Sequence, residues 1–213
     1  MFKHKRQITI TMGNYPEFIS LYIAGICVAV FLLQLIFGTD PFILDRSLLW
    51  IRPWTLITSI FAHSGIGHFL SNMFGLMLFG LILEGRVGPK RTLWLFLGSA
   101  ILINIFSPYE RSLGASGGIY AILGCLAMLR PKLIVWVSGM PMPMILAGMF
   151  WAVQDTIGIF VPSDVGNIAH LIGLFIGVGI GIYWRRWFKD KPNKKGYDPN
   201  LEKEIDKWEI EPK

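Results

Sequence analysis

Charge is scarce in this sequence, and its scarcity excludes an ordinary water-soluble domain. Only 16% of the 213 residues are charged, whereas 53% are hydrophobic, and the mean hydropathy is +0.52. Soluble domains carry about 25% charged residues. The composition therefore predicts a chain that lives largely in a lipid bilayer.

Cysteines and repeats are scarce too. Cys27 and Cys125 stand in separate apolar segments, which excludes a disulfide scaffold and gives no metal-binding spacing. The absence of an internal repeat argues against a small transporter, a class usually built from repeats. We expect neither a metal nor a cofactor.

Long charge-poor runs are what the sequence does contain. Several are shorter than the ~20 residues that cross a bilayer core, but charged or Pro/Gly-rich breaks separate them. They predict an all-α membrane protein, a bundle of six transmembrane helices over residues 15–187, between a cytosolic leader (1–14) and a flexible, charged cytosolic tail (188–213). The six expected spans are Phe18–Phe37, His68–Leu83, Thr92–Phe106, Ser116–Leu129, Pro143–Val161 and Val165–Tyr183.

Lysine and arginine predict the orientation of these spans. Of the 20 basic residues, all except Arg46, Arg52 and Arg111 fall in the segments on the same side as both termini. Positive charge collects on the cytoplasmic side, so both termini are expected in the cytoplasm. The net charge of +6 then reflects topology, and we expect no nucleic-acid partner.

Ser116 and His170 are polar residues at the heads of two apolar segments. Counted at ~1.5 Å per residue from the inner anchors Arg130 and Arg185, they lie about 21 Å and about 22–23 Å from the inner face. They therefore share one depth. A serine needs a base to act as a nucleophile, and a polar residue inside a membrane indicates a functional site.

The same counting brings two more polar residues to this level. His68 and Asn72, measured from Glu84, lie at about 24 and 18 Å and bracket the depth of Ser116. Small residues let membrane helices approach closely, so the fourth and sixth spans are expected to pack together. The small residues of these two spans are Gly117, Gly118, Ala121 and Gly124 in the fourth, and Gly173, Gly177 and Gly181 in the sixth.

The stretch Gly114–Gly118 also matches the G-x-S-x-G elbow of soluble hydrolases. That motif requires a strand before it and a sheet around it, and membrane spans flank it here. We therefore expect a short helix that begins at Ser116, entered by a loop (107–115) that dips below the surface beside a water-filled cavity. The free amides at its start suit a developing oxyanion.

Taken together, these motifs resemble the rhomboid family of intramembrane serine proteases, in its prokaryotic six-span type. They cover residues 53–181, and their order and spacing are specific. The matching elements are Trp54 with Leu56–His63, His68–Asn72, Glu84–Gly88, Gly114–Gly117, and Ala169-His170 with Gly173 and Gly177. The family often has arginine after the first-loop tryptophan, where this chain has Thr55.

The resemblance implies a Ser–His dyad without an aspartate. Ser116 would be the nucleophile and His170 the general base and acid, with an oxyanion site formed by the Ser116 amide and the side chains of His68 and Asn72. Tyr120 would pack against His170. The glycines expected to support the site are Gly114, Gly117, Gly173 and Gly177. Asp155 in the fifth span is expected to stand at the periphery, facing the aqueous cavity or headgroups, with no part in a triad.

The implied function is an endopeptidase that cleaves transmembrane segments of single-span substrates near the outer membrane face. Its partners would be that substrate and membrane lipid, and its place the cell (inner or plasma) membrane, multi-pass, with the site open to the extracytoplasmic side. The alternative is an inactive relative that binds or escorts membrane segments. The oligomeric state, the natural substrate and the gating element are left open.

Overall fold

Helices occupy all six predicted spans in the computed structural model, which describes residues 18–161 and 165–190. The second span is one continuous helix, in which the π-helical turn η3 joins α3 to α4. The long elements are α1 (Ile19–Phe37), α3 (Ile66–Gly75), η3 (Leu76–Gly80), α4 (Leu81–Val87), α5 (Pro89–Phe106), α6 (Ser116–Leu129), α7 (Met144–Gly158) and α8 (Asn167–Asp190).

Three of these segments, 19–37, 66–87 and 167–187, are long and apolar enough to cross a membrane. The leader, and the tail beyond residue 190, lie outside the described residues. Helix α8 runs to Asp190, so its last three residues belong to the region predicted as tail.

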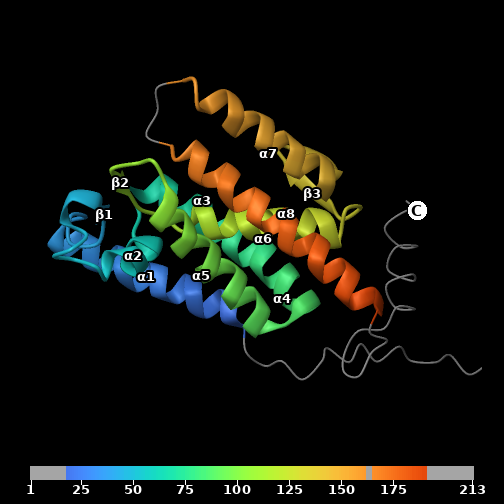
Figure 1. Ribbon diagram of the computed structural model, residues 1–213, viewed down its shortest axis with the longest axis horizontal. Helices are drawn as coiled ribbons and strands as arrows, with labels where there is room; N and C mark the ends of the chain where they lie inside the picture. The colour runs from blue at the N-terminus through green and yellow to red at the C-terminus, as the bar shows by residue number, and fades with distance from the viewer. Residues whose placement is uncertain (1–17, 162–164, 191–213) are drawn as a thin grey trace, which may run out of the picture.

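Helix α6 forms the centre of the bundle. Eleven of its fourteen residues are buried, because α8, α5, α7 and η3 all pack around it. In Figure 1, α7 lies at one edge of the molecule beside α8, and α1 lies at the opposite edge. The helix that begins with Ser116 is thus shielded by its neighbours, as its short length requires.

The predicted close contact between the fourth and sixth spans is confirmed, and it places backbone against backbone. A Cβ atom on Gly173 or Gly177 would overlap the carbonyl oxygen of Gly117 or Ala121, respectively. One turn further along, a Cβ on Gly181 would lie 2.9 Å from the Cys125 carbonyl oxygen. Glycine is therefore a steric requirement along this face of α8.

A β-hairpin that the sequence reading did not predict precedes α7. Strands β3 (Ile134–Val137) and β4 (Met140–Pro143) pair antiparallel around Ser138 and Gly139. Both turn residues have positive φ, 51° and 82°, as the two-residue turn of a tight hairpin demands. Over the described residues the fold is therefore helical with two small β-ribbons, this hairpin and a second ribbon formed by strands from two different loops.

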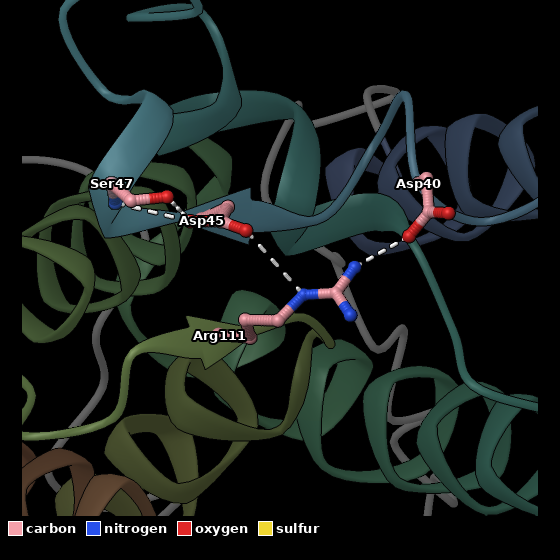
Figure 2. Close-up of polar contacts among 4 residues, drawn as sticks. All are labelled: Asp40, Asp45, Ser47 and Arg111. Carbon is pink, nitrogen blue, oxygen red and sulfur yellow. Dashed lines mark hydrogen bonds and ion pairs between the residues drawn. The ribbon is translucent and has the colours of Figure 1, made fainter.

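That second ribbon ties the first loop to the segment before α6. Strand β1 (Leu44–Asp45) pairs with β2 (Arg111–Ser112), while η1 (Arg46–Leu48), α2 (Thr55–Thr58) and η2 (Ser59–Phe61) fill the rest of the loop. Figure 2 shows the Arg111 guanidinium between two carboxylates, 2.5 Å from Asp40 and 3.6 Å from Asp45. The hydrogen bond from Ser47 and the charge of Arg111 lower the pKa of Asp45.

Arg46 anchors the same loop to the end of α5. Its guanidinium donates to the carbonyl oxygens of Asn104 at 3.1 Å and Tyr109 at 3.0 Å, and also to that of Ser107. Carbonyls at a helix C-terminus lack intrahelical partners, and a cation there complements the helix dipole. Thr55, in the position where the family often has arginine, instead donates its hydroxyl to the Arg52 carbonyl at 2.7 Å.

Candidate active site

Ser116 is the first residue of α6, and a constrained turn leads the chain into it. Gly114 has φ +119°, a conformation that L side chains rarely adopt. A Cβ at Gly114 would lie 2.8 Å from Cε1 of His68. The glycine therefore serves both the turn and the approach of the His68 ring, while its own amide donates to the Ser59 carbonyl at 2.8 Å.

His170 lies in the first turn of α8 and meets Ser116 directly. Its Nε2 atom is 2.9 Å from the Ser116 hydroxyl oxygen. The ring stacks on Tyr120, with centroids 4.2 Å apart and planes 10° from parallel. The His170 side chain is only 12% exposed, so the serine–histidine pair lies inside the bundle but remains reachable.

The expectation that Asp155 stands at the periphery is wrong. The residue is 3% exposed, and its Oδ1 lies 3.0 Å from Nδ1 of His170. Helix α7 packs along both α6 and α8, which turns this one acidic residue inward. Ser116, His170 and Asp155 therefore form a continuous hydrogen-bonded row across α6, α8 and α7.

His68 approaches Ser116 from α3, on the side of Gly114. Its Nδ1 atom accepts at 3.5 Å from the Ser64 backbone amide, which can only donate, and lies 3.1 Å from the Ser64 hydroxyl. A neutral imidazole that accepts at one nitrogen donates at the other. The Nε2–H of His68 is thus available as a donor, as an oxyanion site requires.

Asn72 lies one turn further along α3 and is 5% exposed. One hydrogen of its amide is donated to the His68 carbonyl at 2.9 Å, which leaves the second free for a ligand. The first amides of α6, including that of Ser116, have no partner within the helix. The structure therefore leaves donors available on α3, at His68 and Asn72, and at the start of α6.

Two further polar features are the histidine His63, which borders this cluster, and a cavity that lies apart from it. His63 is 1% exposed, packs edge-on against His68 and Phe69, and neither of its ring nitrogens has a hydrogen-bond partner. A cavity of about 390 Å³ lies in the first loop between Asp40, Asp45, Arg52 and Arg111; its lining does not include Ser116 or His170. Among the described residues, no three His, Cys, Asp or Glu side chains form a metal-binding group.

Comparison with known proteins identifies the family. The model of the Rhomboid domain matches residues 51–187, well over half of the chain. The chain belongs to the rhomboid family. The matched region contains every residue of the Ser116–His170–Asp155 row, together with His68 and Asn72.

Named rhomboid relatives come from bacteria and plants. Putative rhomboid protease YdcA of Bacillus subtilis is 33% identical over 129 residues, 57% of this chain and 62% of that protein. Rhomboid protease GlpG of Yersinia pseudotuberculosis is 25% identical over 184 residues, 79% of this chain and 63% of the relative. RHOMBOID-like protein 1 of Arabidopsis thaliana is 29% identical over 153 residues, 68% of this chain and 39% of its own length.

The chain thus spans less than two thirds of the length of these rhomboid relatives.

The sequence reading did not predict the contacts of three residues, Arg46, Ser64 and Asp155. Arg46 and Ser64 act through backbone and ring contacts that have no sequence signature. Asp155 did have a sequence signature, because an ionisable residue inside an apolar span indicates a functional site by default.

Proposed function

We propose that this chain is an intramembrane serine endopeptidase that cleaves the transmembrane segments of single-span proteins. The observation that carries the proposal is the 2.9 Å contact between Ser116 Oγ and His170 Nε2 at the start of α6. A nucleophile within hydrogen-bond reach of a base is the geometric signature of covalent catalysis. Membership of the rhomboid family, whose relatives include named proteases, supports the same reaction.

Acylation follows from this geometry. His170 accepts the Ser116 proton at Nε2 while Oγ bonds to the scissile carbonyl carbon. The carbonyl oxygen becomes an oxyanion, which accepts hydrogen bonds from the Ser116 amide, His68 Nε2–H and the free Asn72 hydrogen. The tetrahedral intermediate collapses when His170 returns its proton to the leaving nitrogen, and the C–N bond breaks.

Deacylation repeats these steps with water. His170 takes a proton from a water molecule, whose oxygen attacks the acyl carbon, and then protonates Ser116 Oγ as the ester bond breaks. Water must reach a site inside an apolar bundle. The loop 107–115, which contains polar side chains and ends at Ser116, is the route that we propose.

We propose that all six helical segments cross the membrane, with both termini in the cytoplasm and the site open to the extracytoplasmic side of the cell membrane. The lysine and arginine distribution supports this orientation. Substrates would carry helix-destabilising residues near their outer end, because the carbonyls of an intact helix are hydrogen-bonded and shielded from attack.

Cleavage of a single-span model substrate in liposomes tests the proposal. Wild-type protein should release the two fragments and Ser116→Ala should release none above background, because the nucleophile is gone. Ser138→Ala is the matched control, since Ser138 lies in the turn between β3 and β4, and it should cleave normally. A serine-directed fluorophosphonate should label wild type and Ser138→Ala, but neither Ser116→Ala nor His170→Ala.

The same experiment separates the alternative, an inactive relative that escorts membrane segments. Such a protein would retain the substrate through purification without cutting it and would resist the fluorophosphonate. Equal cleavage by wild type and Ser116→Ala would likewise overturn the proposed protease.

A further inference from the structure

The His170 imidazole is held at both of its nitrogens. Nε2 lies 2.9 Å from the hydroxyl of Ser116, and Nδ1 lies 3.0 Å from the carboxylate of Asp155. The three side chains come from three different helices, α6, α8 and α7. Any role of the carboxylate therefore acts through the histidine.

This contact decides which ring nitrogen carries the proton. An ionised carboxylate only accepts hydrogen bonds, so His170 Nδ1 must donate to Asp155. The neutral imidazole then has its lone pair at Nε2, facing the Ser116 hydroxyl. This is the tautomer that can remove the serine proton; the opposite tautomer would present an N–H to Ser116 and could not act as its base.

The surroundings of Asp155 argue against a purely structural role. Its second oxygen, Oδ2, is buried without a hydrogen-bond partner, although the Tyr120 phenol lies close enough to interact with the carboxylate. A buried carboxylate is costly, and an apolar side chain of similar size would often stabilise the fold better. The carboxylate is useful when a positive charge forms beside it, as happens when His170 takes the serine proton.

We propose that Asp155 is the positioning residue of a Ser116–His170–Asp155 triad, in place of the dyad implied by the family resemblance. It holds His170 in the productive tautomer and stabilises the imidazolium of both transition states. The proposal rests on the proposed protease function, and it adds α7 to the elements that build the catalytic geometry.

The test compares Asp155→Asn with Asp155→Ala, using Gln154→Ala as the matched control because Gln154 is the exposed neighbour on α7. In the liposome cleavage assay, Asp155→Asn should lower kcat by about 10²–10⁴-fold with KM unchanged, as loss of the equivalent charge does in serine proteases. Asp155→Ala should be impaired at least tenfold in kcat, and Gln154→Ala should match wild type.

A purely structural role for Asp155 predicts the opposite result. Asparagine nearly preserves the shape of aspartate, so a side chain that only fills space would leave Asp155→Asn at wild-type kcat. That result would overturn the triad, as would a kcat loss that appears only together with a lowered melting temperature and a raised KM. Retained thermal stability with a loss of kcat supports it.

These experiments distinguish failure of the triad proposal from failure of the protease proposal. If wild type cleaves, Ser116→Ala does not, and Asp155→Asn cleaves normally, the protease stands and the triad is wrong. If wild type neither cleaves nor reacts with fluorophosphonate, the protease is wrong, and the triad fails with it.

Discussion

The two faces of α8 are built on different principles. Towards α6, glycines bring backbone against backbone, so that even a methyl group on Gly177 would overlap the Ala121 carbonyl. Towards α7, the contact consists of side chains, namely Asp155 against His170 and Asn167 against Gly158. The first face fixes where the base stands, and the second influences its protonation and orientation.

The helices on the two sides differ in the same way. Eleven of the fourteen residues of α6 are buried, against four of the fifteen residues of α7, and Asp155 is one of those four. Helix α7 thus contributes little packing but contains a charged group at the centre of the site. Dense packing and chemical influence are separable in this bundle, and substitutions on each face should show different deficits.

Among the substitutions that alter packing around His170, the largest effect is expected on the glycine face. Gly177→Ala should lower the free energy of unfolding by about 1–3 kcal/mol, the usual cost of overpacking. It should also reduce cleavage by about 100-fold, because separating α8 from α6 by an ångström misplaces His170 relative to Ser116. Cleavage rates and unfolding in denaturing detergent measure the two effects.

Gly179→Ala is the control for this experiment, because nothing lies within 4 Å of a Cβ at Gly179. Alanine favours the helix by up to ~1 kcal/mol over glycine, so stability should hold or rise and cleavage should not change. If Gly177→Ala behaved like Gly179→Ala, the contact would not be as rigid as described.

The sequence predicted the α6 face of α8 better than its α7 face, because only the α6 face has clear signals in the sequence. Glycines at four-residue spacing mark the α6 side, and Arg130 and Arg185 gave depth markers that put Ser116 and His170 on one level. Helix α7 offered no such marker. It begins at Met144 after an unpredicted hairpin, without a charged residue at its inner end, so the depth and rotation of Asp155 could not be counted.

Contacts made by the loops were also not predictable from the sequence. The sequence shows that Arg46 is charged, but its partners are backbone carbonyls. Because every residue has a backbone carbonyl, the sequence does not identify these partners. The sequence analysis likewise did not predict the Ser64–His68 contact, although the spacing of four residues at the start of a helix permits it. Sequence patterns and the family resemblance predicted the helices, the pair at the centre and the packing of Tyr120 against His170, but not the contacts of Arg46, Ser64 and Asp155.

A smaller effect is expected where the two faces meet, at Tyr120. Its ring stacks on His170, and such stacking contributes about 0.5–1.5 kcal/mol. Tyr120→Leu should therefore lower kcat/KM by about 2–10-fold, while Tyr120→Phe, which keeps the ring, should lose less. Steady-state cleavage of the model substrate measures both variants, and equal losses in the two would assign the effect to the phenol instead of the stack.

Among the same packing substitutions, the smallest effect is expected at Gly158, which meets α8 from α7. A Cβ there would lie 2.6 Å from Asn167 Oδ1, but this atom ends a side chain that can rotate, whereas the carbonyl opposite Gly177 cannot. Gly158→Ala should therefore lower the free energy of unfolding by less than the ~1–3 kcal/mol of overpacking expected for Gly177→Ala, and cleavage should fall only a few-fold. If thermal unfolding and cleavage suffered as much as in Gly177→Ala, both faces of α8 would be equally rigid, and the position of His170 would depend on α7 as strictly as on α6.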